Sequence, residues 1–259
     1  MHPVRRPTSM HSMSLFDPPA TAATAPVLAF DIEIANEFDL APGEDLDRYA
    51  PFDVSVAATT TREGPVRHWY SRDAAGRPAR QLDATLARDV LAFLRAEQQR
   101  GALVCAWNGM AFDLRWLGHA ADDAALAAEV ALDLYDPMFQ FVSRRGFPVS
   151  LAAVADGMGV PETKLMSGAD APKEWARGNH QKVLDYVAGD CRLTRAVVER
   201  IVARREVRWR TRKGTVSVEA LPRLERVRDV MRAPAPDQSW MSDPKPWESW
   251  FGWLAPFVR

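Results

Sequence analysis

The sequence has few cysteines, no excess of positive charge and no long apolar run. Its two cysteines, Cys105 and Cys191, lack the spacing of a metal-binding cluster, so we expect free thiols in a reducing compartment. The 33 Lys and Arg residues against 34 Asp and Glu residues give a net charge of -1, which argues against a protein that coats duplex nucleic acid. No apolar run approaches the roughly 18 residues of a transmembrane helix. We therefore expect a cytoplasmic protein that does not enter a membrane.

The most informative stretch is Val27–Ile34, which reads V-L-A-F-D-I-E-I and has the composition of a buried strand. Asp31 and Glu33 interrupt it, and both point to the same face because side chains alternate along a strand. Two neighbouring buried carboxylates repel each other when ionised, which raises the pKa of both. A bound cation removes this electrostatic cost. The strand is therefore predicted to form half of a divalent-metal site, with the missing carboxylates further along the chain.

The pattern of apolar residues predicts an α/β fold with a mixed sheet of five strands flanked by helices. After the first strand, further strands are expected at Asp53–Thr61, Val66–Tyr70, Leu103–Trp107 and Val130–Leu134. A helix over Gln81–Arg100 connects the third strand to the fourth. The usual right-handed crossover then places the fourth strand beside the first.

Two later segments carry the further carboxylates. In N-G-M-A-F-D-L-R-W-L, Asn108 begins a turn and Asp113 lies in the first turn of a helix, where the helix dipole favours a carboxylate. In Y-V-A-G-D, Tyr186 and Asp190 lie one turn apart on one face of a helix predicted over His180–Arg205. Each segment alone is weak evidence, since first-turn acids and tyrosine–carboxylate pairs also occur by chance.

The composition divides the chain into three parts. Residues 1–25 are rich in Pro, Ser, Thr and Ala and are predicted to be a disordered tail, and residues 26–205 form the main domain. Residues 206–259 form a C-terminal extension with a hairpin around Lys213-Gly214 and a Trp-rich final helix. The simpler interpretation of that helix is packing on the main domain; the alternative is stacking on bases or docking a partner protein. Its apolar face consists of Trp247, Trp250, Phe251 and Leu254.

The order and spacing of these motifs resemble the DEDD superfamily of 3′-5′ exonucleases, whose domain has a ribonuclease H-like fold. D-I-E is similar to the first motif, N-G-M-A-F-D-L-R-W-L to the second and Y-V-A-G-D to the third. Tyr186 occupies the place of the tyrosine (DEDDy) subtype, while Asp185 stands where the histidine subtype has its His. The segment M-S-G-A-D-A-P-K-E-W-A-R-G also resembles the exonuclease domains of family-B DNA polymerases. The resemblance covers residues 26–205.

The resemblance implies an exonuclease that uses two Mg²⁺ or Mn²⁺ ions to release nucleoside 5′-monophosphates from the 3′ end of a single-stranded nucleic acid. DNA is favoured as the substrate, and the sequence itself does not distinguish DNA from RNA. By similarity, the nucleophile-activating ion is held by Asp31, Glu33 and Asp190, with Asp31 bridging to a second ion. Asp113 is implied to hold the water ligands of that second ion. Tyr186 is implied to orient the attacking water, since its ordinary pKa is about 10 and makes it a poor base.

Three further residues are expected to contact the substrate, namely Asn108, Phe112 and Lys164. Three alternative functions remain open: two other kinds of nuclease and one protein without enzymatic activity. An endonuclease of ribonuclease H or resolvase type is disfavoured because such enzymes take their Glu from a helix, not from the first strand. The second alternative enzyme is an exoribonuclease, which acts on RNA. A nucleic-acid-binding or scaffold module with a degenerate site is disfavoured because all five expected catalytic positions are filled.

Overall fold

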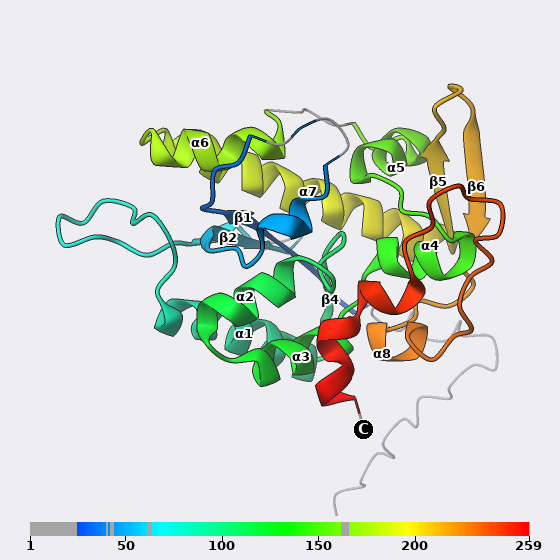
Figure 1. Ribbon diagram of the computed structural model, residues 1–259, viewed down its shortest axis with the longest axis horizontal. Helices are drawn as coiled ribbons and strands as arrows, with labels where there is room; N and C mark the ends of the chain where they lie inside the picture. The colour runs from blue at the N-terminus through cyan, green and yellow to red at the C-terminus, as the bar shows by residue number, and fades with distance from the viewer. Residues whose placement is uncertain (1–24, 40, 42–43, 62–63, 162–165, 259) are drawn as a thin grey trace, which may run out of the picture.

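The computed structural model describes residues 25–39, 41, 44–61, 64–161 and 166–258. In this part of the chain, helices pack on both faces of one mixed sheet in an α/β fold (Figure 1). None of the described helices is both long enough and apolar enough to span a bilayer. The tail predicted over residues 1–25 lies outside the described residues except for its last position, and Lys164 lies outside them as well.

The main sheet has four strands in the order β3-β2-β1-β4. β1 (Val27–Ile34) is an inner strand, antiparallel to β2 (Val54–Thr60) and parallel to β4 (Leu103–Cys105). β3 (Arg67–Trp69) pairs with β2 and forms one edge. α1 (Ala84–Gln99) provides the crossover to β4, as the sequence predicts. The antiparallel meander and the parallel return are therefore both confirmed.

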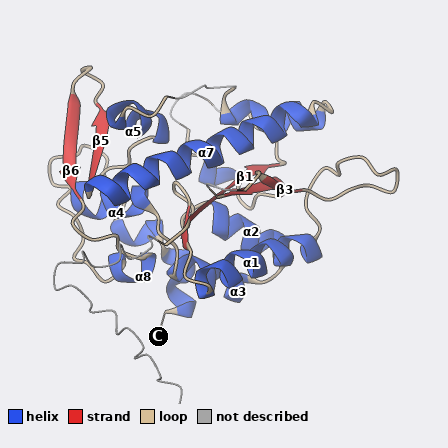
Figure 2. Cartoon of the chain, turned by 180° about the vertical axis from the view of Figure 1, so that it is seen from behind, coloured by secondary structure: helices blue, strands red, loops and turns tan. Residues whose placement is uncertain are grey.

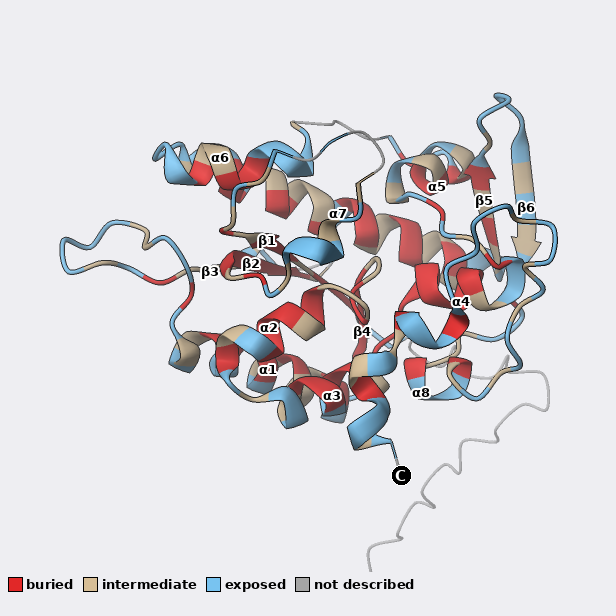
Figure 3. Ribbon diagram, viewed as in Figure 1, coloured by how far each residue is buried: buried red, intermediate tan, exposed pale blue. Residues whose placement is uncertain are grey.

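Helices form a layer on each side of this sheet (Figure 2). α1, α2 (Asp113–Ala121) and α3 (Ala124–Leu132) lie on one side. The long α7 (His180–Arg204) crosses the other side, and α6 (Ala171–Ala176) packs against it. Buried residues concentrate where the layers meet, as Figure 3 shows in red. α7 therefore lies directly over the strand that carries Asp31 and Glu33.

The predicted fifth strand at Val130–Leu134 is wrong. Most of that run ends α3, and a strand position is reached only at Tyr135, which makes a single parallel bridge to Cys105 of β4. The segment A-A-L-A-A-E-V-A-L is rich in alanine, the best helix former, and Asp123 caps it by accepting a hydrogen bond from the Leu126 amide. A short apolar run does not by itself distinguish a buried strand from a buried helix.

The C-terminal extension begins with the predicted hairpin, which forms a separate two-stranded sheet. β5 (Glu206–Arg210) and β6 (Val216–Ala220) are antiparallel and pack on α5 (Leu151–Met158). The contact is close enough to require glycine, because a Cβ atom on Gly157 would lie 2.5 Å from backbone atoms of Trp209. α4 (Pro137–Arg145) precedes α5 and lies beside the hairpin in Figure 1.

The rest of the extension is less helical than the sequence predicts. Between the hairpin and the C-terminal end, α8 (Val227–Val230) is a single short helix. The Trp-rich end, for which one helix is predicted, forms two 3-10 helices, η3 (Trp247–Trp250) and η4 (Gly252–Phe257). Pro256 lacks an amide hydrogen, which disfavours a longer α-helix here. Trp247, Trp250 and Leu254 are buried in the main core, and the Trp247 ring stacks on Phe139 with centroids 5.0 Å apart. Packing on the main domain is therefore confirmed for these side chains.

Candidate active site

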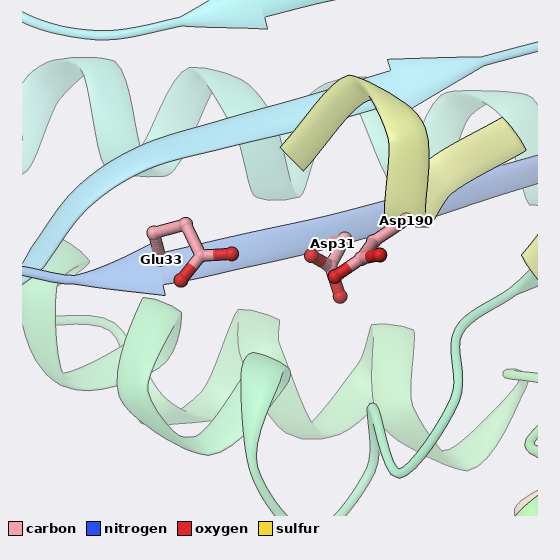
Figure 4. Close-up of side chains that lie close together, drawn as sticks. All are labelled: Asp31, Glu33 and Asp190. Carbon is pink, nitrogen blue, oxygen red and sulfur yellow. The ribbon is translucent and has the colours of Figure 1, made fainter. Parts of the chain in front are cut away.

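Three carboxylates from two distant segments meet at one face of the sheet. Asp31 and Glu33 of β1 and Asp190 of α7 each place an oxygen within 4.8 Å of the others, as the close-up in Figure 4 shows. The strand contributes two of these oxygens because residues two apart share a face. Convergence of the first and last motifs, separated by more than 150 residues of chain, matches the arrangement expected from the sequence.

Apolar packing fixes the helix that carries Asp190. Val183, Val187 and Cys191 of α7 are buried and pack in one cluster with Val56 and Ala58 of β2. These α7 residues recur at helical spacing and so form one stripe along the helix. With that stripe pressed on β2, the neighbouring part of α7 lies over β1, and Asp190 reaches the two β1 carboxylates.

Asp113 is buried beside this group but is held differently. Its Oδ1 accepts a hydrogen bond of 3.1 Å from the backbone amide of Ile32, the residue between Asp31 and Glu33. β4 pairs with β1 only as far as Ala29, so the Ile32 amide has no partner on β4. The carboxylate of Asp113 accepts its hydrogen bond instead. Asp113 therefore lies next to the other carboxylates without belonging to the group whose oxygens are within 4.8 Å.

Electrostatics at this site favour a bound positive charge. Burial is the main cause that raises the pKa of Asp31 and of Glu33 well above their usual values, and the charges of neighbouring carboxylates raise both further. Burial and the charge of Asp136 raise the pKa of Asp113 to about 7. Protons or a cation relieve this repulsion, and oxygen-only ligands suit hard divalent cations such as Mg²⁺ and Mn²⁺. The residues present therefore fit a divalent-metal site.

Tyr186 lies one helical turn before Asp190 and is half-buried. Burial, the charges of Asp190 and Glu33 and a hydrogen bond with the Asp190 side chain raise the pKa of its phenol. The hydroxyl therefore stays protonated at neutral pH and serves as a hydrogen-bond donor. A Cβ atom on Gly168 would lie 3.4 Å from this hydroxyl, so a loop without a side chain borders it. Asp185, by contrast, is exposed and accepts a hydrogen bond from Gln181.

A mostly apolar pocket of about 250 Å³ opens beside Glu33. Phe112 lines it together with Phe38 and Pro172, and its contact with a substrate stays a prediction. Asn108 does not line this pocket; its φ of 65° places it in the left-handed region, where asparagine is favoured among non-glycine residues, and it turns the chain between β4 and α2. Lys164 cannot be placed relative to the pocket because it lies outside the described residues.

Asp136 is a buried carboxylate near the site that sequence analysis missed. It caps α4 by accepting from the Phe139 amide and also accepts from the amides of Asn108 and Met110, at 3.1–3.2 Å. Burial nevertheless raises its pKa to about 6. The loop before Asp113 is held a second time by Trp253 of the extension, whose indole donates to the Met110 carbonyl at 3.0 Å. An Asp-Pro pair before a helical run was the available signal for the cap.

Comparison with known proteins agrees with this fold. Residues 69–202 match the model of the RNase H superfamily. No curated protein matches the chain. The family B DNA polymerase from the hyperthermophilic archaeon Pyrobaculum calidifontis is similar at 21% identity over 69% of this chain, with a TM-score of 0.47, and this chain spans 24% of the length of that polymerase. The RNase H family model covers just over half of the 259 residues of this chain, so the protein belongs to the RNase H superfamily. This membership supports nuclease activity on a nucleic acid.

Proposed function

We propose that the protein is a metal-dependent 3′-5′ exonuclease of the tyrosine subtype, which acts on the 3′ end of single-stranded nucleic acid, DNA in preference to RNA. One observation carries the proposal: the oxygens of Asp31, Glu33 and Asp190 converge within 4.8 Å, with Glu33 buried, the other two partly buried, and Asp113 hydrogen-bonded to the same strand. The residues fit two Mg²⁺ or Mn²⁺ ions, which when bound neutralise the scissile phosphate and lower the pKa of a water.

Each side chain has a distinct task in this proposal. Asp31, Glu33 and Asp190 supply the ligand oxygens at the centre, and Asp31 lies next to Asp113, so it is placed to serve both ions. Asp113 is fixed by the Ile32 amide, and its other carboxylate oxygen would hold water ligands of the second ion. Positioning of this kind needs a rigid frame, which the strand and the packed helix α7 provide.

Tyr186 orients the attacking water and does not take its proton. Because the pKa of its phenol is raised, the hydroxyl keeps its single proton; it donates that proton to Asp190, and its oxygen accepts from the attacking water and so orients it. Its hydrogen bond with Asp190 keeps it next to the ligand oxygens. Phosphodiester hydrolysis depends mainly on such positioning and on charge stabilisation, so a donor in this place contributes without carrying charge.

The pocket beside Glu33 supports action on a chain end. It has room for a single terminal base against the rings of Phe38 and Phe112, with Pro172 on another wall. Its lining is mostly apolar and offers few partners for the extra 2′-hydroxyl of RNA, which is why DNA is preferred in this proposal. The segment around Gly168 borders both the pocket and the Tyr186 hydroxyl, so binding a terminal nucleotide and aligning the water occur side by side.

The proposal is tested with Asp190→Asn and, as a matched control, Asp185→Asn on the exposed face of the same helix. Substrates are a 5′-labelled single strand of DNA, its RNA counterpart and a circular single strand, each with Mn²⁺. We expect wild type and Asp185→Asn to shorten the linear DNA stepwise, to act more slowly on RNA and to leave the circle intact. Asp190→Asn should lose this activity while circular dichroism shows the fold unchanged.

Shortening by Asp190→Asn at the wild-type rate would contradict the assignment of the carboxylates. Cleavage of the circle would instead point to an endonuclease. Equal or faster hydrolysis of the RNA strand would contradict the DNA preference while leaving the metal centre in place.

A further inference from the structure

The segment from the end of α7 through the turn of the β5–β6 hairpin, residues 204–213, is the most basic part of the described chain. Of the ten residues 204–213, six are Arg or Lys and one, Glu206, is acidic. The whole chain nevertheless has a net charge of -1, so this concentration is local. Figure 1 shows the hairpin at one end of the molecule, at the far end of α7 from α6. A basic cluster on one element is a typical footprint of a surface that binds the phosphates of nucleic acid.

Four of these cations are exposed and make no ion pair within the described residues. Arg204 and Arg205 lie at the end of α7, and Arg212 and Lys213 lie in the hairpin turn. Two further arginines pair with partly exposed carboxylates. Arg208 pairs with Glu206 at 2.7 Å, and Arg210 donates to both carboxylate oxygens of Asp156, at 2.9 and 3.1 Å, and to the Gly214 carbonyl. An exposed single pair contributes little to stability, so a phosphate competes more easily for Arg208 than for the bidentate Arg210.

Strand geometry arranges the cations in a row. Arg208 and Arg210 are two residues apart on β5, so they point to the same face and lie about 6.8 Å apart along the strand. Across the hairpin they pair with Val218 and Val216, whose side chains are 49% and 43% exposed. The outer face therefore combines positive charge with half-exposed apolar surface.

An exposed aromatic ring lies next to the hairpin. Trp240 is 62% exposed, yet its ring is held in place by a hydrogen bond from its indole to the Asp237 carbonyl at 3.1 Å and by an edge contact with Phe147 at 5.7 Å. Phe147 in turn contacts Trp209 of β5 at 6.4 Å; Trp209 faces the side of the hairpin opposite Arg208 and Arg210, so Trp240 lies beside the hairpin and not on its outer face. A fixed ring with a free face is a platform on which a base stacks, and stacking tolerates any sequence.

We propose that the exposed cations of the β5–β6 hairpin, with Trp240 at its side, form a second binding surface for single-stranded nucleic acid, separate from the carboxylate site. This inference rests on the proposed function, because the strand held here is the strand whose 3′ end reaches the carboxylates. Its phosphates contact the row of cations from Arg208 to Lys213, and a base stacks on Trp240. The metal centre alone, with its negative charge, provides little attraction for a polyanion before metal binds.

The reach between the two surfaces sets the substrate length that uses both. Asp190 and Arg205 are 15 residues apart along and just beyond α7, which corresponds to about 22 Å at 1.5 Å per residue. A stacked single strand rises about 3.4 Å per nucleotide, so about six nucleotides span this distance. Strands of about 4 nucleotides therefore contact only the carboxylate site, and strands of about 20 contact both surfaces.

The test compares the affinity of Arg212→Glu/Lys213→Glu with that of wild type by fluorescence anisotropy in a chelator, so that no hydrolysis occurs. The probes are 5′-labelled single strands of about 4 and about 20 nucleotides over a range of salt concentrations. For the longer strand we expect affinity to fall at least about tenfold and the slope of log K against log salt to become shallower by about 1.4, since about 0.7 is lost per phosphate contact. Trp240→Ala should lower the affinity about tenfold without changing that slope.

The matched control is Arg80→Glu/Arg88→Glu, which makes the same change of charge at two exposed residues outside the hairpin. Its affinity for the longer strand should stay close to that of wild type. With Mn²⁺ present, the hairpin variant should hydrolyse the shortest strand at the wild-type rate and show a raised KM only for the longer one.

An equal loss of affinity in the hairpin variant and the control would overturn the proposal, because the effect would then be one of overall charge. Unchanged affinity in the hairpin variant would also overturn the proposal of a second nucleic-acid surface. The exposed edge of β6 would then be a candidate site for a protein partner. Neither result touches the carboxylate assignment, because binding is measured without metal or hydrolysis.

Discussion

α7 joins two regions of opposite chemistry. At its middle, Asp190 completes a buried group of carboxylates whose pKa values are raised because like charges lie together in a desolvated place. At its end, the chain enters a hairpin of exposed cations that need no partner because water solvates them. The carboxylate group destabilises the fold until a cation binds, whereas the cationic hairpin is stable without a ligand. The comparison teaches that burial, more than charge, distinguishes a reactive centre from a binding surface in this fold.

The largest expected effect comes from removing a carboxylate from the buried region. Asp31→Asn should lower hydrolysis by about a thousandfold or more, because a metal site supplies several kcal/mol of charge stabilisation. The same change should raise the melting temperature of the metal-free protein, since one of several repelling carboxylates is gone. Kinetics with Mn²⁺ and calorimetric melts in chelator measure the two effects. A less stable metal-free variant would contradict the view that this region is strained without a cation.

The next effect concerns the loop that carries Asp113. Asp136→Ala leaves the amides of Asn108, Met110 and Phe139 without their acceptor, at a cost of about 1–3 kcal/mol for a buried unpaired group. Trp253→Phe removes a single hydrogen bond to the same loop and should cost less, about 1 kcal/mol. Urea unfolding measures the free energies. Mn²⁺ affinity should fall in both variants, and unchanged affinity would show that the loop does not position Asp113.

The pH dependence of stability follows from raised pKa values. Burial raises the pKa of Asp113 to about 7 from its usual 3.8, so the folded state binds this proton more tightly than the unfolded state. Its contribution is therefore fully present below about pH 4 and is lost as the pH rises to about 7. Stabilisation by Mn²⁺ should grow over the same range, because the metal competes with protons. Melting curves with and without Mn²⁺ across this range check both trends, and stabilisation independent of pH would contradict them.

A smaller effect is expected from the phenol. Tyr186→Phe keeps the ring but removes the donor that faces Asp190, and a single hydrogen bond of about 1.4 kcal/mol corresponds to a rate about tenfold lower. Because this side chain is not a metal ligand, Mn²⁺ affinity should not change. Steady-state kinetics measure the hydrolysis rate, and titration with Mn²⁺ measures the metal affinity. A wild-type rate would remove Tyr186 from the reaction.

Much of the fold was predictable because it depends on local periodicity. The alternation around Asp31 and Glu33 identified β1 and the face of its carboxylates, and helical spacing placed Tyr186 beside Asp190. The fifth strand was mispredicted because the apolar run at Val130–Leu134 fits a buried helix equally well. The Trp-rich end was predicted to pack on the domain but not to form 3-10 helices, which depend on how it meets the core around Phe139.

Details of the site depend on contacts between distant residues. The bond from the Ile32 amide to Asp113 exists because β4 stops pairing beside Ala29, and no local pattern shows where that pairing ends. Asp136 could be predicted as a helix cap but not as the acceptor that holds the loop before Asp113. The roles of Asn108 and Lys164 toward a substrate remain predictions, since the first lies outside the pocket and the second outside the described residues.

The most direct test of the central claim is calorimetric titration of Mn²⁺ into the metal-free protein, compared among wild type, Asp190→Asn and Asp185→Asn. If the carboxylates of β1 and α7 share a cation, wild type and Asp185→Asn should bind Mn²⁺ with equal affinity and Asp190→Asn should lose most of that binding. Equal binding by all three proteins would show that the converging carboxylates are not a metal centre.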